Sequence, residues 1–208
     1  MPDFELEQTA GCWPIAGVDE AGRGPLSGPV VAAAVIWAEQ GPPADLAARL
    51  DDSKKLSATA RAELEQQIKD KASCWAVAEA SVAEIDRLNI LQSTLLAMRR
   101  AVEALDQQPR IALIDGNRPP SLMFCTVQTV IKGDAKSLSI AAASILAKTA
   151  RDREMARLDA LHPGYGWAQN QGYPTKAHMQ ALQDLGVTPH HRASFRPVRE
   201  ALRAMEQV

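Results

Sequence analysis

The chain has 208 residues, which is long enough for a sizeable buried core without disulfide bonds or a structural metal ion. Hydrophobic residues make up 46% of the sequence and charged residues 23%, and this ordinary globular balance excludes a disordered chain and a coiled coil. Twenty-three Lys and Arg against 25 Asp and Glu give a formal net charge of −2. There is therefore no overall basic signal, and any surface that binds nucleic acid must be local.

The cysteines and the apolar segments indicate where the protein resides. Cys12, Cys74 and Cys125 are odd in number, lie far apart and lack CxxC spacing, which is typical of reduced thiols and not of a disulfide framework or a zinc site. The N-terminus is acidic where a signal peptide would be basic and apolar. The most apolar run, residues 28–38, is too short to span a bilayer. We therefore expect a cytoplasmic protein with no membrane contact.

Hydrophobic patterning predicts strands and helices that alternate along the chain. Val30–Ile36 is β-branched and almost continuously apolar, as expected of a strand that is buried on both faces. Ser57 is placed to cap the first long helix and Asn89 the second. The predicted elements are, in order, strands at 15–19 and 30–36, a helix at 58–71, a strand at 74–82, a helix after Asn89, strands at 111–114 and 125–131, and helices at 138–161, at 175–185 and near the C-terminus.

This alternation predicts an α/β fold with a largely buried sheet. We expect residues 1–14 to form an N-terminal tail and residues 15–208 to form a single domain. The change from mixed patterns to mostly helix and loop predicts a helical C-terminal extension from about residue 160.

Acidic residues stand at the ends of predicted strands. Asp19 and Glu20 end the first strand, and since neighbouring strand side chains point to opposite faces, both could reach one site only if the chain leaves the strand at Glu20. Asp115 ends the strand at 111–114, and Asp134 follows the strand at 125–131. Each has an ordinary alternative role. Asp19 and Glu20 could be a solvated acidic pair at a turn, Asp115 could start an Asp-Gly turn, and Asp134 could cap a helix. Four carboxylates at strand ends nevertheless predict one cluster.

Such a cluster is typical of a site for hard cations. Crowded carboxylates repel unless a cation neutralises them, and ligation by oxygen alone favours Mg²⁺ or Mn²⁺ over zinc. Two such ions, roughly 3.5–4 Å apart, clamp the attacking and leaving oxygens of an in-line phosphoryl displacement. The sequence therefore predicts metal-dependent phosphoryl chemistry at this cluster, and which of the two ions is preferred stays open.

Several polar residues nearby are candidates for phosphate contacts. The loop Gly22-Arg23-Gly24 offers backbone N–H groups and a guanidinium, and Lys54 lies in a second polar loop. Ser144 and Lys148 fall, with Arg151, on one face of the helix at 138–161. The alternative for that face is solvation with a Lys148–Asp152 ion pair.

An aromatic residue between glycines is a candidate for stacking on a sugar or a base. Tyr165 stands in the loop Gly164-Tyr165-Gly166-Trp167, and its alternative role is to pack this loop onto the protein. His178, His190 and His191 lack the spacing of a zinc site.

The segments that carry these residues, taken together and in order, resemble bacterial ribonuclease HII. Any one of the segments is weak, but the ordered set is specific and covers most of the chain from Ile15 to Val198. The matching segments are Ala16–Pro25, Asp52–Ser57, Ile114–Asn117, Lys132–Asp134, Ile140–Lys148 with Arg151 and Asp152, Gly172–Thr175 with His178, and His191, Arg192, Ser194 and Phe195.

The resemblance implies an RNase H-like mixed sheet flanked by helices. It implies an endonuclease that cleaves the RNA strand of RNA/DNA hybrids and incises duplex DNA 5′ to a single embedded ribonucleotide, leaving 3′-OH and 5′-phosphate ends. It places metal ligation on Asp19, Glu20, Asp115 and Asp134, with Asp19 expected to bridge two ions. Recognition of the ribose 2′-OH is implied for Gly22–Gly24 and for Tyr165, whereas Tyr173 is expected to pack its own turn.

Two other functions stay open at this stage. One is a nuclease of the same fold that does not depend on a 2′-OH, and the other is a non-catalytic module that binds nucleic acid. The expected partners are RNA/DNA hybrids and duplex DNA containing ribonucleotides, and the protein is expected to be a monomer. The amphipathic tail after Phe195 is expected to pack on the body, with binding to an unknown protein partner as the alternative.

Overall fold

A computed structural model of the chain describes residues 1–51, 53 and 56–206. Its centre is a five-stranded sheet with the strand order β3-β2-β1-β4-β5. β1 pairs antiparallel with β2 and parallel with β4, so the sheet is mixed, as predicted. The strands are β1 (Ile15–Ala21), β2 (Val30–Ile36), β3 (Cys74–Ala80), β4 (Ile111–Asp115) and β5 (Thr126–Val130).

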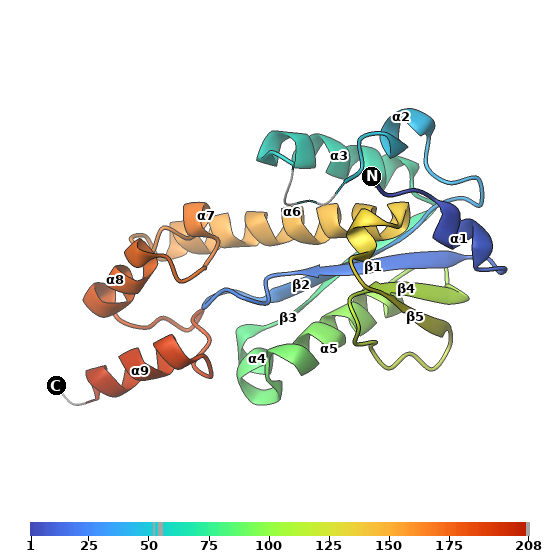
Figure 1. Ribbon diagram of the computed structural model, residues 1–208. Helices are drawn as coiled ribbons and strands as arrows, with labels where there is room; N and C mark the ends of the chain where they lie inside the picture. Colours follow the sequence, from blue (N-terminus) through green and yellow to red (C-terminus); the bar gives the residue numbers. More distant parts are fainter. Residues whose placement is uncertain (52, 54–55, 207–208) are drawn as a thin grey trace.

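Helices cover both faces of the sheet (Figure 1). α3 (Ala58–Lys71) and α6 (Leu138–Leu161) lie over one face, and α5 (Ile90–Glu103) lies over the other. β2 is buried along its whole length, because Ala32 and Ala34 face α5 while Ala33 and Val35 face α3 and α6. Small side chains on both faces let the helices pack close to the strand, which explains the alanine-rich run.

α6 crosses β1 at very short range. A Cβ atom placed on Gly17 would lie 2.2 Å from the backbone carbon of Ser139, so only glycine fits at this crossing. The first turn of α6 is also closed by two side chains. Ser137 caps it by accepting the N–H of Ile140, and the buried Glu7 accepts the N–H of Ser139 at 2.9 Å. The long helix is thereby fixed over the strand that carries Asp19.

The first fourteen residues pack against this arrangement. They contain α1 (Glu5–Thr9), which presents Glu7 to the start of α6. Phe4 contacts the core below α6, and its ring lies 6.0 Å from that of Trp13. The segment that was predicted as a tail is thus part of the folded body.

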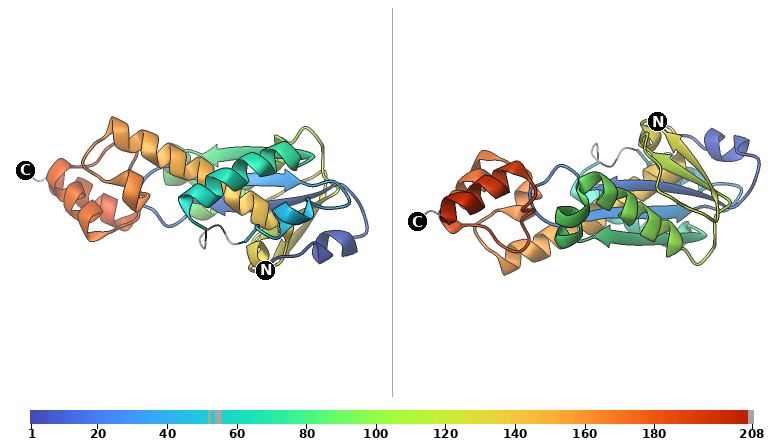
Figure 2. Two further views of the ribbon diagram at one scale, coloured as in Figure 1. Left: turned by 90° about the horizontal axis from the view of Figure 1, so that it is seen from above. Right: turned by 90° about the horizontal axis from the view of Figure 1, so that it is seen from below.

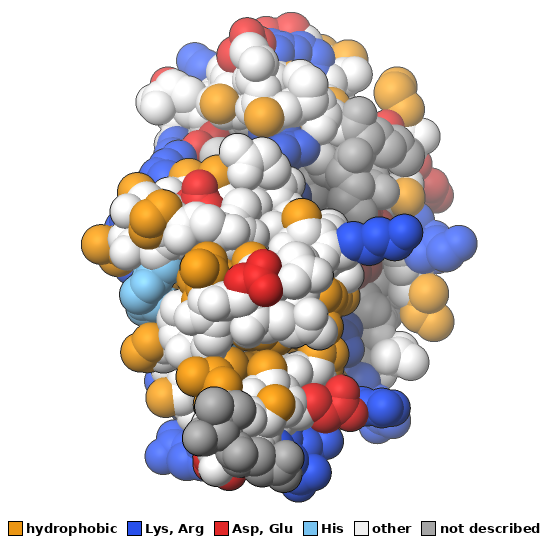
Figure 3. Space-filling view, turned by 90° about the vertical axis from the view of Figure 1, so that its left-hand side faces the viewer, with side chains coloured by type: hydrophobic (Ala, Val, Ile, Leu, Met, Phe, Trp, Pro, Cys, Tyr) orange, Lys and Arg blue, Asp and Glu red, His pale blue; other side chains and the backbone are white. Residues whose placement is uncertain are grey.

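The C-terminal helices gather at one end of the molecule, beyond the sheet and around the second half of α6 (Figures 1 and 2). They are α7 (Trp167–Asn170), α8 (Lys176–Leu185) and α9 (Arg196–Met205). We refer to residues 162–206 as the C-terminal extension. Seen end-on, it presents small groups of hydrophobic side chains among polar ones (Figure 3). α9 packs inward through Val198, which is fully buried against Leu26 and Leu182.

The structure differs locally from the predictions. β1 does not end at Asp19 but continues through Ala21, with Glu20 paired opposite Ala32 of β2. β3 ends at Ala80, because Ser81 caps a further helix, α4 (Val82–Leu88), in a reciprocal capping box with Glu84. A short helix, α2 (Ala44–Ala47), precedes α3. Within the described ranges, no helix is both long and apolar enough to cross a bilayer.

Candidate active site

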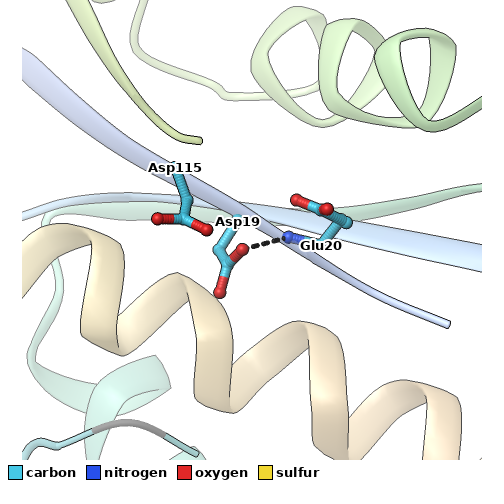
Figure 4. A group of neighbouring side chains, drawn as sticks. All are labelled: Asp19, Glu20 and Asp115. Carbon is cyan, nitrogen blue, oxygen red and sulfur yellow. Dashed lines mark hydrogen bonds between the residues drawn. The ribbon is translucent and has the colours of Figure 1, made fainter. Parts of the chain in front are cut away.

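Three carboxylates meet where β1 and β4 part. The β1–β4 pairing ends at Val18 opposite Ile114, and the next residues along the two parallel strands are Asp19 and Asp115. One carboxylate oxygen from each of Asp19, Glu20 and Asp115 lies within 4.8 Å of the others (Figure 4). The chain stays in the strand at Glu20, and Asp19 and Glu20 nevertheless each bring a carboxylate oxygen within 4.8 Å of Asp115. The predicted cluster is therefore present for three of its four members.

Asp134, the fourth predicted carboxylate, is not part of this group of Asp19, Glu20 and Asp115, which we call the acidic triad. It lies in η1 (Gly133–Ala135), and its side chain is half-buried. The neighbouring Gly133 donates its backbone N–H to Asp115 Oδ1 at 2.7 Å, which ties η1 to the triad. Asp134 is not among the three carboxylates that lie within 4.8 Å of one another.

Burial and mutual repulsion shape the electrostatics of the triad. Burial, together with the nearby charges of Glu20 and Asp115, raises the pKa of Asp19 well above its ordinary value. Burial also raises the pKa of Glu20, and Arg23 opposes this shift through an ion pair at 3.2 Å. The backbone N–H of Glu20 donates to Asp19 Oδ1 at 2.7 Å, which fixes the Asp19 carboxylate (Figure 4).

A cleft of about 390 Å³ opens beside the triad. The Gly22–Gly24 loop and Glu20 line one side of it, and Tyr173 projects into it. Ser144 and Lys148 of α6 line it too, together with Ser53 and with Arg61, which sequence reasoning missed. A smaller hollow, lined by Glu20 and Asp115 and by Thr94, Asn117 and Arg118, lies on the other side of the triad. The carboxylates thus stand between two depressions of the surface.

The polar residues on the floor of the cleft form two small networks. Ser144 hydrogen-bonds to Asp19, and its Oγ lies 2.9 Å from that of Ser53. Lys148 pairs with Asp152, the alternative considered for that helix face, and Arg61 contacts the other oxygen of the same carboxylate at 3.1 Å. Lys148 therefore lines the cleft and at the same time forms an ion pair with Asp152. Lys54, a further predicted phosphate contact, lies outside the described residues.

The structure corrects the prediction for Tyr165. That side chain is 5% exposed, stacks on Trp167 with ring centroids 4.9 Å apart, and donates its hydroxyl to the carbonyl of Gly186 at 2.9 Å. It therefore packs the interior of the C-terminal extension. Tyr173, which was expected to pack its own turn, is 48% exposed and lines the cleft. Only the tertiary structure distinguishes the two, because both follow a glycine in a short loop.

Arg192, which sequence reasoning left without a role, holds the Gly22–Gly24 loop in place. Its guanidinium is fully buried and forms five hydrogen bonds, one for each of its N–H groups, all to backbone carbonyls. Burial lowers the pKa of Arg192 to about 9, so it remains a cation at neutral pH. The acceptors are the carbonyl oxygens of Gly22, Arg23, Pro25, Gly28 and Pro29, at 2.6–3.2 Å.

Arg151 supports the same loop from below. It was expected to contact phosphates, but its side chain is 1% exposed and donates to the carbonyls of Ser27, Pro29 and Gln171. A Cβ atom on Gly22, whose φ is +97°, would collide with the Arg151 side chain. Glycine is thus required where the loop passes over this guanidinium.

Comparison with known proteins agrees with the fold and with the order of the motifs. The family model described as Ribonuclease HII matches residues 16–198. A ribonuclease HII from Ruegeria sp. is 57% identical and one from Rhodospirillum rubrum is 58% identical, each over 97% of this chain and over 87% and 92% of the relative. A crystal structure of the ribonuclease H2 from Pyrococcus horikoshii covers 93% of this chain and 99% of its own, with a TM-score of 0.78 and 27% identity.

Proposed function

This chain belongs to the ribonuclease HII family, and on that premise we propose that its acidic cleft hydrolyses a phosphodiester on the 5′ side of a ribonucleotide. The chain is a ribonuclease H-type endonuclease that acts on RNA/DNA. The finer proposal is that it cleaves the RNA strand of hybrids, incises duplex DNA at a single embedded ribonucleotide, and leaves 3′-OH and 5′-phosphate ends.

One observation carries this proposal: Glu20 of the acidic triad, the Gly22–Gly24 loop and Tyr173 line a single cleft. The triad supplies the chemistry, while the loop and the aromatic ring supply a surface for a sugar. Glu20 belongs to the triad and also lines the cleft, so a sugar held against the loop lies next to the carboxylates. The residues proposed to select a ribose then lie next to those proposed to hydrolyse its 5′ phosphodiester.

The donor set fits divalent cations. Three carboxylates within 4.8 Å supply only oxygen ligands, and the raised pKa of Asp19 reflects negative charge that is crowded and buried. We propose that Asp19, Glu20 and Asp115 hold Mg²⁺ or Mn²⁺, with Asp134 completing the ligand set. Bound cations of this kind polarise a phosphoryl group and stabilise the charge that develops in an in-line displacement. Ser144 keeps Asp19 oriented through a hydrogen bond to its carboxylate.

The Gly22–Gly24 loop and Tyr173 form the proposed ribose-reading wall. The loop carbonyls are engaged by Arg192, so the loop is held in shape before a substrate binds. A site that is built to bond a hydroxyl rejects an analogue without it, because the polar groups of the site are left unpaired. Arg61 and Lys148 on the floor are placed to contact the phosphates that flank the sugar.

Cleavage of duplex DNA with one ribonucleotide tests the proposal. We expect incision 5′ to that ribonucleotide in Mg²⁺ or Mn²⁺, no incision after EDTA is added, and none of an all-deoxy duplex. Cleavage of the all-deoxy duplex would instead establish a nuclease that does not need the 2′-OH.

Substitution of a carboxylate separates catalysis from binding. Asp115→Asn keeps the size of the side chain but removes its charge, so we expect it to abolish incision while the variant still binds the duplex. A variant that works as well as the wild type would mean that the triad is structural, as in a non-catalytic binding module.

A further inference from the structure

A group of buried rings lies behind Tyr173 in the C-terminal extension. His178 of α8 and His191 are 0% and 2% exposed, and they pack edge-on against Tyr165 and Trp167. We call these four residues the ring cluster. They are not part of the cleft surface, yet α8 begins just after Tyr173, so the cluster and the cleft share one short stretch of chain.

The hydrogen bonds of the ring cluster assign each imidazole proton. Trp167 Nε1 donates to His178 Nε2 at 3.0 Å, so this nitrogen accepts and His178 carries its proton on Nδ1. The backbone N–H of Thr188 donates to His191 Nδ1 at 3.0 Å, so His191 carries its proton on Nε2. That proton points to His178 Nε2, 3.3 Å away. With these tautomers both rings are neutral, and the one lone pair on His178 Nε2 is shared between Trp167 at 3.0 Å and His191 at 3.3 Å.

The proton on His178 Nδ1 is directed at the backbone of Tyr173. The two atoms that this bond joins, His178 Nδ1 and the carbonyl oxygen of Tyr173, are 2.9 Å apart. The same carbonyl accepts the N–H of Thr175 at 2.8 Å, and the N–H of Tyr173 donates to Asn170 at 2.9 Å. The peptide of Tyr173 is thus held on both sides, which leaves only its side-chain torsions free in the cleft.

The ring of Tyr173 lies against the Gly22–Gly24 loop, its partner in the proposed ribose-reading wall. A Cβ atom on Gly24 would be 3.1 Å from Cε1 of Tyr173, closer than an ordinary contact. Gly24 belongs to the loop that Arg192 holds, and Arg192 directly follows His191. Two consecutive residues therefore support the two parts of the ribose-reading wall: Arg192 holds the loop directly, and His191 supports Tyr173 through His178. A displacement of His178 would alter the distance between the tyrosine ring and the loop.

We propose that His178 is a positioning residue for ribose recognition, which the ring cluster keeps in the one tautomer that can hold Tyr173 against Gly24. This inference rests on the proposed function above and adds a residue that does not touch the substrate. It predicts that changes at His178 act through Tyr173 alone and leave phosphate contacts and the acidic triad unaffected.

Two substitutions at His178 and one control test the inference. His178→Phe keeps a ring but removes the donor, whereas His178→Asn retains an amide nitrogen at the position of Nδ1 along the side chain. We expect His178→Phe to lower kcat/KM for a duplex with one ribonucleotide by about 3- to 10-fold, as for the loss of one hydrogen bond, and His178→Asn to recover most of it. The matched control is His162→Phe, since His162 also contacts the ring of Trp167 but is not bonded to Tyr173.

A second measurement separates positioning from general damage. The affinity of His178→Phe for an all-deoxy duplex should equal that of the wild type, because phosphate contacts do not involve Tyr173. In a Tyr173→Ala background, His178→Phe should cause no further loss of kcat/KM. Independent losses that multiply in the double variant would overturn the inference, as would a folded His178→Phe protein with wild-type kcat/KM.

The tautomers give a test that needs no variant and no activity. Nitrogen-15 NMR of the wild type should show the proton of His178 on Nδ1 and that of His191 on Nε2, and the opposite tautomer at His178 would overturn the inference even if His178→Phe fails to fold. A wild-type protein that does not incise at a single ribonucleotide would overturn the proposed function and the inference with it. Normal incision together with unaffected His178 variants would overturn the inference alone.

Discussion

At the scale of single residues, the cleft depends on which of two tyrosines reaches it. Tyr173 is half exposed beside Gly24, and Tyr165 is buried with its hydroxyl bonded to Gly186. We expect Tyr173→Ala to lower kcat/KM for a single-ribonucleotide duplex by at least about tenfold, because contact of an aromatic ring with a nucleotide is worth on the order of 1–3 kcal/mol. Melting temperature should change little, since the side chain is not part of the core.

Tyr165→Phe is the matched control for this prediction. It removes a buried hydrogen bond of about 1 kcal/mol and should lower the melting temperature by a few degrees, with incision by the folded protein unchanged. The reverse pattern, in which Tyr165→Phe impairs incision and Tyr173→Ala does not, would contradict the assignment of Tyr173 to the cleft.

His191 is also expected to make the free energy of unfolding depend on pH. Burial, with the neighbouring His178, His162 and His190, lowers the pKa of His191 to about 3, below its ordinary value near 6.5. The unfolded chain therefore binds a proton that the folded chain does not, and the stability due to neutral His191 is present above pH 6.5 and is lost as pH falls toward 3. Between pH 7 and pH 5 this loss amounts to about 2 kcal/mol of the free energy of unfolding.

Urea unfolding of the wild type and of His191→Gln at both pH values checks this expectation. Carboxylates with raised pKa, such as Asp19, change the stability in the opposite sense, but they are present in both proteins. The difference between the two pH dependences therefore isolates His191. Identical losses of stability in the two proteins would count against a buried, neutral ring at this position.

At the scale of elements, the Gly22–Gly24 loop is shaped by a side chain distant in sequence. Arg192 gives its five N–H groups to carbonyls of residues 22–29, two of them in this loop, and the planar fork of a guanidinium has no equivalent in an ammonium group. We expect Arg192→Lys to lower kcat/KM for a single-ribonucleotide duplex about tenfold or more and to lower the melting temperature as well, because buried carbonyls lose their donors.

The control for this substitution is Arg196→Lys, at the exposed start of α9, where the arginine pairs only with Glu200 among the described residues. Surface pairs of this kind contribute little, so incision and melting temperature should both stay near the wild-type values. Equal effects of the two substitutions would mean that Arg192 acts as a general surface cation and does not shape the loop.

At the scale of the whole molecule, the cleft combines residues from the sheet and from the C-terminal extension. The acidic triad stands on β1 and β4, whereas Tyr173 and Arg192 come from the C-terminal extension. α6 joins the two, because its first half covers the sheet and its second half carries the extension (Figure 2). The cleft is complete only when the extension is docked.

Deletion from Val198 onward tests how firmly the last helix of the extension, α9, is packed on the protein. Val198 is fully buried against Leu26 and Leu182, and Leu202 packs partly on the same group. Loss of this apolar burial, about 2–3 kcal/mol, should lower the melting temperature by roughly 5–10 °C, as measured by circular dichroism. An unchanged melting temperature would favour the alternative of a segment that is free to bind a partner protein.

The sequence by itself determined the five strands, the long helices and three of the four carboxylates of the acidic centre. The helix at 138–161 and the strand at 30–36 have the predicted bounds, because their apolar patterns are local and strong. The proximity of Asp19 and Asp115 follows from a general rule, because neighbouring parallel strands end at the same edge of a sheet. Local pattern and strand polarity were sufficient for these features.

Only the tertiary structure decided which side chains complete the cleft. Tyr173 and Tyr165 have similar surroundings in the sequence, and their exchange of roles depends on the packing of Tyr165 in the C-terminal extension against Met155 and Leu158 of α6. Arg151 and Arg192 are of the residue type that usually contacts phosphates. Both are instead buried, and they donate to backbone carbonyls more than one hundred residues away in the sequence. Side-chain direction and long-range burial are properties of packing, and no spacing along the chain encodes them.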